Sequence, residues 1–154
     1  VDKAAKEGNP HAIEFPRAKV GDNPYDFSFS GLKSAVLNYI NHAKMMGEEI
    51  NVPDLAASFQ NAVVEVLVSR TIEAAKQHGY KCVAIAGGVA SNSALRAGME
   101  KACKEAGIQF FHPSPIFCTD NAAMIGAAAY YEYKKGARAG WDLNAVPNLK
   151  LGER

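Results

Sequence analysis

Residues 82–92 read CVAIAGGVASN, a continuous apolar run that leads into two glycines and then into two residues that favour helix starts. A short apolar run bounded by glycine is typical of a buried strand in a parallel sheet. The glycine pair turns the chain, and Ser91 and Asn92 are suited to cap a helix. We therefore predict a buried strand over residues 82–86, followed directly by a turn and a helix.

The sequence that follows completes a strand–helix–strand unit. Leu95, Met99 and Cys103 recur at helical spacing until Gly107 ends the helix, and Ile108–Phe111 reads as a second apolar strand. Two apolar strands joined by a helix of this length form a right-handed crossover with parallel strands. The predicted fold class is therefore α/β.

Further helices are predicted on both sides of this unit, from apolar periodicity and from capping residues. They run from Ser30 to Gly47, from Pro53 to Gly79 and from Ala122 to Tyr133. The second is apolar around much of its circumference, so we expect it to be central and buried. Alternation of apolar and polar residues predicts a short strand over residues 27–30. Turn residues at 8–10 and 21–24 predict loops.

Length and composition indicate one globular domain. The chain has 154 residues, of which 48% are hydrophobic and 21% charged, so disorder is not expected. We expect a single lobe, with a strand-and-helix region over 1–50, a long helix and βαβα core over 51–136, and an extended surface tail over 137–154. The missing initial methionine suggests that the chain begins inside a longer polypeptide.

Charge and cysteine content narrow the classes of partner. The formal net charge of +1 gives no basic field that could hold nucleic acid by itself. No apolar run approaches the roughly 20 residues that a membrane helix needs, and the N-terminus has no apolar signal region. The three cysteines, Cys82, Cys103 and Cys118, form no C-x-x-C pair. They indicate reduced thiols in a cytoplasmic protein.

The turn after the first strand is the first candidate for a ligand site. Gly87 and Gly88 lack a Cβ, so a ligand can approach the backbone closely, and the next helix would offer free N–H groups. In open α/β sheets, ligands bind at the carboxyl ends of the strands, where this turn is expected. The alternative is that the glycines only make a tight turn and that Asn92 is only a cap.

The second candidate follows the second strand. Asp120 lies in Cys118–Asn121 (CTDN), and a carboxylate at the end of a strand can bind a metal or a magnesium-nucleotide. The alternative is an N-cap, since Thr, Asp and Asn are all favoured there. Both candidates are expected at one edge of the same sheet, so the Asn92 and Asp120 turns should open side by side.

A third candidate is less specific. Residues 27–33 (FSFSGLK) offer Ser30 or Lys33 at a helix N-terminus, although burial of two phenylalanines is at least as good an explanation. The four histidines form neither an H-x-x-x-H nor an H-E-x-x-H pair, and no nucleophile–base pair is evident. The chain therefore lacks a complete metal site, and we expect no independent metalloenzyme.

Several motifs together resemble one family, the TsaD (also called Gcp) proteins. They lie in the same order along nearly the whole chain: KEGNP at 6–10, FPR at 15–17, FSFSGLK at 27–33, AGGVASN at 86–92 with Leu95–Arg96, and CTDNAAMI at 118–125. The resemblance implies the actin-like, sugar-kinase-like ATPase (ASKHA) fold, in which two RNase H-like lobes enclose the ligand. The matched motifs resemble the C-terminal signatures of that family, so this chain would be the C-terminal lobe, with additional helices. It further implies a transferase that moves a threonylcarbamoyl group from threonylcarbamoyl-adenylate to the adenosine beside the tRNA anticodon.

The resemblance also assigns roles to residues. Asp120 matches the family's metal-ligating aspartate, whose metal is iron or zinc, and Asn92 matches the asparagine that contacts the adenylate or nucleotide. Gly87 and Gly88 would form the adjoining wall, and Ser91 is expected to belong to the same nucleotide-binding set. The family's two metal-binding histidines and its phosphate loop belong to the other lobe. The implied partners are tRNA, an adenine nucleotide and accessory tRNA-modification subunits, and we expect the isolated lobe to be inactive.

Two other functions are compatible with the sequence at this stage. The family's older name is O-sialoglycoprotein endopeptidase, but no H-E-x-x-H or equivalent water-activating set is present. A catalytically silent lobe that docks partner proteins through the exposed faces of its early helices is the other alternative.

Overall fold

The computed structural model describes residues 1–17 and 25–150. The predicted loop at 21–24 and the last residues of the predicted tail, 151–154, lie outside the described residues. The chain divides into two units, Val1–Thr119 and Asp120–Arg154. Each unit is considered by itself.

The first unit begins with three helices, and glycine and capping residues lie at the ends of the longer two. They are α1 (Asp2–Ala5), α2 (Ser30–Met46) and α3 (Val52–Gln77). Helix α2 ends at Gly47, whose φ of 69° is left-handed and favours glycine. The Asn51 side chain caps α3 by accepting the Asp54 N–H at 3.1 Å. The helix therefore begins at Val52, one residue before the predicted start at Pro53.

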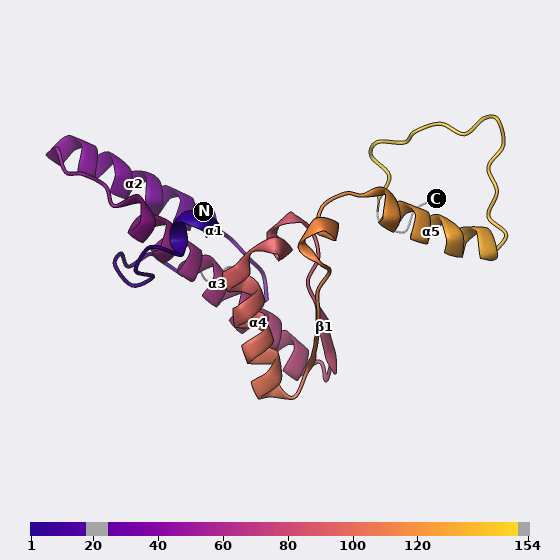
Figure 1. Ribbon diagram of the computed structural model, residues 1–154, viewed down its shortest axis with the longest axis horizontal. Helices are drawn as coiled ribbons and strands as arrows, with labels where there is room; N and C mark the ends of the chain where they lie inside the picture. Colours follow the sequence, from indigo (N-terminus) through magenta and orange to yellow (C-terminus); the bar gives the residue numbers. More distant parts are fainter. Residues whose placement is uncertain (18–24, 151–154) are drawn as a thin grey trace. The chain divides into compact units, whose positions relative to one another are not determined.

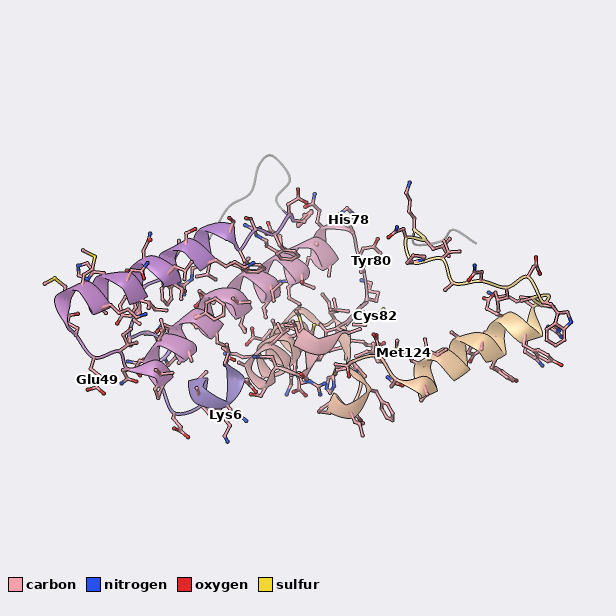
Figure 2. The ribbon with its side chains drawn as sticks, turned by 90° about the horizontal axis from the view of Figure 1, so that it is seen from above. Lys6, Glu49, His78, Tyr80, Cys82 and Met124 are labelled. Atoms are coloured by element: carbon pink, nitrogen blue, oxygen red, sulfur yellow. The ribbon has the colours of Figure 1, made fainter. Side chains whose placement is uncertain are left out.

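Helices α2 and α3 lie side by side and bury a common cluster (Figures 1 and 2). The loop that carries Glu49 joins them (Figure 2). At the centre of the cluster, Phe15 from the N-terminal segment, Leu32 of α2 and Ala62 of α3 are each at most 3% exposed. The predicted apolar face of α2 therefore packs on α3, and the predicted central position of α3 is confirmed.

The predicted strand–helix–strand unit is confirmed. Strands β1 (Cys82–Ala84) and β2 (Gln109–Phe111) pair in parallel, with Cys82 opposite Gln109. Helix α4 (Ser93–Ala106) connects them and packs on α3 and the sheet (Figure 1). The core there consists of Ile72, Ala75, Val83, Leu95, Met99, Cys103 and Ile108.

The sheet is buried on one face only, which corrects the prediction of a fully buried strand. Val83 points into the core, whereas its neighbours Cys82 and Ala84 are exposed, and so is Phe111 of β2. The apolar run is present as predicted, but no described residue of the first unit covers the second face of the sheet.

The predicted strand over residues 27–30 is wrong. Phe29 immediately precedes α2, and Phe27 stacks against it with ring centroids 6.5 Å apart. The Arg70 guanidinium lies 5.9 Å from the Phe27 ring, and it also bonds to the carbonyl oxygen of Asp26. The alternating phenylalanines thus reflect packing on α3, not pairing with another strand.

The second unit contains α5 (Ala122–Lys134), which is close to the predicted helix, and a tail over 137–150 without helix or strand. No residue of α5 is buried. None of the described helices combines the length and the apolar character that crossing a bilayer requires.

The N-terminal segment packs tightly on the start of α3 around Gly8. A Cβ built on Gly8 would lie 2.1 Å from the carbonyl oxygen of Pro53, a backbone atom that cannot move aside. Buried Ser58 secures the same segment, because its hydroxyl donates to Asn9 O at 3.2 Å and accepts the Ile13 N–H at 3.1 Å. The segment is therefore a fixed part of the first unit.

We expect Gly8→Ala to lower the free energy of unfolding of the chain by about 1–3 kcal/mol, the usual cost of overpacking. Urea unfolding followed by circular dichroism measures it. Gly31→Ala is the matched control, because a Cβ at Gly31 would meet no atom within 4 Å. Equal stability of the two variants would contradict this close packing.

Candidate functional site

The turn after β1 has the tight geometry that its glycines predicted. Gly87 has a φ of 84°, a conformation that residues with a Cβ rarely adopt. A short 3-10 helix, η1 (Gly88–Ser91), follows, and the Ser91 hydroxyl closes it by donating to Gly88 O at 2.6 Å. Ser91 therefore belongs to the turn. The prediction that it caps α4 together with Asn92 is wrong for Ser91.

Asn92 is the cap of α4. Its Oδ1 accepts the Leu95 N–H at 2.9 Å, and its Nδ2 donates to Oε1 of Gln60 on α3 at 2.7 Å. The side chain is half-buried. The structural role is thus real, yet the amide oxygen keeps a second lone pair and the nitrogen a second hydrogen. Its contact with a nucleotide stays a prediction.

We expect Asn92→Ala to destabilise the chain by about 1 kcal/mol through loss of the cap. The variant also leaves the Gln60 side chain without its amide partner. Urea unfolding measures the loss, with Asn38→Ala as control, since Asn38 is exposed in the interior of α2. If the two alanine variants unfold at the same urea concentration, Asn92 does not hold α4.

The N-terminus of α4 differs from the expectation of free N–H groups. Asp2 of α1 lies there, and its carboxylate accepts the Ser93 hydroxyl at 2.8 Å and the Ser93 N–H at 3.4 Å. This carboxylate was missed, because it is 91 residues away in the sequence. A negative charge already occupies the positive end of the helix dipole, so an anionic group arriving there would be repelled.

The connection after β2 lies beside the turn after β1. It contains a second 3-10 helix, η2 (Pro115–Phe117), then buried Cys118 and exposed Thr119. A Cβ built on Gly88 would lie 3.7 Å from Cγ2 of Thr119, an ordinary van der Waals contact. The two connections are therefore neighbours within the first unit, at the carboxyl ends of both strands.

Asp120 is the first residue of the second unit. Asn121, and not Asp120, caps α5, since its Oδ1 accepts the Met124 N–H at 2.9 Å. The Asp120 side chain is exposed and has no hydrogen bond or ion pair with any other described residue. The capping alternative therefore applies to Asn121, and the Asp120 carboxylate has its lone pairs available for a ligand.

The third candidate shows no sign of a site. Ser30 and Lys33 are exposed at the start of α2, and Ser30 O accepts the Ser34 hydroxyl at 3.2 Å. Among the described residues, neither side chain is bonded to the Gly87–Asn92 turn. The phenylalanines of this motif serve packing, as described above.

Comparison with known proteins gives the family. The sequence model of TsaD, described as tRNA N6-adenosine threonylcarbamoyltransferase, matches residues 1–127. The chain belongs to the TsaD family. Curated relatives from Clostridium botulinum, Clostridium beijerinckii and Clostridium perfringens carry this transferase name.

Three of these TsaD relatives show the extent of the match. A protein of Clostridium botulinum (strain 657 / Type Ba4) is 60% identical over 154 residues, which is 100% of this chain and 45% of the relative. Relatives from Clostridium beijerinckii and Clostridium perfringens (strain 13 / Type A) are 57% and 58% identical over the same shares. The chain thus spans a little under half the length of these TsaD proteins.

The donor atoms of the described residues do not form a complete metal site. Within residues 1–17 and 25–150, no three His, Cys, Asp or Glu side chains group together in a way that could hold a metal ion. All three cysteines are free thiols, and burial raises the pKa of the Cys103 thiol, which keeps it protonated. A single carboxylate such as Asp120 can supply one ligand but cannot bind a transition metal tightly alone.

Arg96 is the other residue whose importance the sequence did not reveal, beyond its place in a TsaD-like motif. It lies in the first turns of α4, where a cation opposes the helix dipole and is disfavoured. Its guanidinium reaches Ala90 O in the turn after β1 and Pro113 O in the connection after β2. In the sequence, an arginine so close to the start of a predicted helix could have indicated that its side chain makes a specific contact.

Proposed function

We propose that this chain forms part of the substrate site of a tRNA N6-adenosine threonylcarbamoyltransferase. The reaction moves threonylcarbamoyl from threonylcarbamoyl-adenylate to the adenosine beside the anticodon. The supporting observation is that the connections carrying the two TsaD-like turns are neighbours, since a Cβ built on Gly88 would lie 3.7 Å from Cγ2 of Thr119, the residue before Asp120. Identity of 60% over the whole chain supports the same function. We also propose that the chain folds as an RNase H-like lobe of the ASKHA fold.

The adenosine part of the donor suits the Gly87–Asn92 turn better than its phosphate does. Asp2 places a carboxylate at the N-terminus of α4, which repels a phosphate but can accept hydrogen bonds from hydroxyl groups. Asn92 would orient the nucleoside with its remaining donor and acceptor. Gly87 and Gly88, both exposed, let the ligand approach the backbone closely.

Asp120 would hold an iron or zinc ion from one side, together with ligands from outside this chain. The bound metal would supply Lewis-acid stabilisation of charge on the donor. Asp120 contributes a fixed negative charge and one oxygen ligand, while the turn holds the nucleoside and limits its motion. The partners proposed with this site are tRNA and accessory tRNA-modification subunits, in the cytoplasm.

The apolar surface that this chain leaves open is consistent with a partner lobe. Phe111 of β2 is 55% exposed, and Ile116 and Phe117 in the next connection are 76% and 49% exposed. In the second unit, Met124 and Ile125 are exposed as well. Exposed apolar side chains that gather on one surface are typical of a face that another part of a protein covers, and Phe111, Ile116 and Phe117 are the candidates in the first unit.

A chimaera tests the function. Residues 1–154 replace the matching 45% of the Clostridium botulinum relative. The purified chimaera is incubated with its metal, accessory subunits, tRNA and threonylcarbamoyl-adenylate, and the tRNA nucleosides are analysed by mass spectrometry. We expect threonylcarbamoyladenosine from the chimaera and none from the isolated chain. A folded chimaera without product, or tight binding of both ATP and iron by the isolated chain, would refute the proposal.

A further inference from the structure

The guanidinium of Arg96 bridges the two connections that form the candidate site. Its Nη2 donates to Pro113 O at 2.8 Å and contacts Cys118 Sγ at 3.1 Å, and its Nε donates to Ala90 O. Its Nη1 lies 3.1 Å from Nδ1 of His112. One half-buried side chain thus links the turn after β1 to three residues of the connection after β2.

These contacts need several donors in fixed relative positions, which an arginine side chain supplies and a lysine does not. The acceptors lie on two separate segments, and the planar guanidinium reaches them with donors in a fixed fork, whereas a lysine ammonium is a single point charge. The position also opposes the dipole of α4, so these contacts must offset an unfavourable interaction. The arrangement therefore does more than neutralise a charge.

The two linked segments are the Gly87–Asn92 turn and the connection after β2 that ends at Thr119. Together they form what we call the rim of the candidate site. Ala90 belongs to η1, between Gly88 and Asn92, and Cys118 directly precedes Thr119, the neighbour of Gly88. Short 3-10 hydrogen bonds hold each segment locally: Asn92 N–H donates to Val89 O and Cys118 N–H to Pro115 O. Arg96 adds a polar connection between the two segments, through its bonds to Ala90 O on one side and Pro113 O on the other.

We propose that Arg96 is a positioning residue for donor binding, which fastens the two connections together and keeps the Gly88 and Thr119 sides of the rim at a fixed separation. The inference rests on the proposed transferase function. It assigns Arg96 no contact with the substrate and no proton transfer. Its loss should loosen both segments and weaken donor binding, while the reacting groups stay unchanged.

Amide hydrogen exchange of the full chain tests the fastening without using the activity. The reporters are the amides of Ala90, Asn92, Phe117 and Cys118, which are all hydrogen-bonded within the two segments. We expect Arg96→Met to accelerate exchange at both segments by about tenfold or more, a scale typical of local opening. Lys101→Met is the matched control, since Lys101 is an exposed cation on the same helix.

Steady-state kinetics of the chimaera tests the consequence. Arg96→Met should raise KM for threonylcarbamoyl-adenylate about tenfold and change kcat by less than about threefold. Arg96→Lys should behave like Arg96→Met, because charge alone does not replace the fork. Lys101→Met should match the wild type in both parameters.

Each result decides the inference. Faster exchange at both segments with a higher KM, unrelieved by lysine, supports it. Unchanged exchange, a change at one segment only, or full rescue by lysine overturns it. Faster exchange with an unchanged KM overturns the positioning role and leaves only a structural one. An inactive wild-type chimaera refutes the transferase function, while the exchange data still show whether Arg96 fastens the segments.

Discussion

Replacing Asp120 with alanine in the chimaera is expected to lower kcat/KM for threonylcarbamoyl transfer by at least about 100-fold. Loss of an outer partner of a metal ligand already costs about 10- to 100-fold, and loss of a ligand costs more. The Asp120 carboxylate is exposed and unbonded among the described residues, so its removal takes away a ligand without breaking a contact of the fold. The stability of the isolated chain should therefore stay within about 0.5 kcal/mol of the wild type.

Metal content and a second aspartate separate this effect from general damage. The metal bound per molecule of chimaera, measured by inductively coupled plasma mass spectrometry, should fall in parallel with activity. Asp142→Ala is the control, because Asp142 is another exposed carboxylate of the second unit. Full activity and metal content in Asp120→Ala would remove Asp120 from the site.

Met99→Ala should cause the largest loss of stability, about 2–5 kcal/mol. Met99 of α4 is 2% exposed and belongs to the core cluster that contains Val83, Cys103 and Ile108. Truncation leaves a cavity in the core that holds β1 and β2 on α4. Because both candidate turns leave from the ends of these strands, the loss should also loosen the site.

The same substitution at an exposed methionine is the control. Met45 on α2 is 86% exposed, so Met45→Ala should change the free energy of unfolding by less than about 0.5 kcal/mol. Urea unfolding of the isolated chain measures both variants. Similar midpoints for Met99→Ala and Met45→Ala would mean that this cluster does not carry the stability of the first unit.

The longer elements could be predicted from the sequence because several local signals agree in them. Helix α4 combines a capping Asn92, apolar residues at helical spacing and a terminal Gly107, and the structure has the same limits. The strand predicted over residues 27–30 failed for the opposite reason. Four alternating residues cannot distinguish strand pairing from the packing of Phe27 and Phe29 beside Arg70.

The site was predictable only in its local parts. The turn at Gly87 and the neighbouring positions of the two connections follow from the order of strands in a parallel sheet. The contact of Asp2 with Ser93 does not, because it joins segments that only the tertiary fold brings together. Likewise, the bond from Asn92 to Gln60 depends on how α4 crosses α3, which the spacing of residues does not specify.

The crystal structure of the chimaera, with its metal and a non-hydrolysable analogue of threonylcarbamoyl-adenylate, tests most directly whether the two turns share one site. We expect a carboxylate oxygen of Asp120 at about 2.0–2.2 Å from the metal. The Asn92 amide should lie within about 3.2 Å of the bound nucleoside. A metal held without Asp120, or a nucleoside bound away from the Gly87–Asn92 turn, would contradict the proposed site.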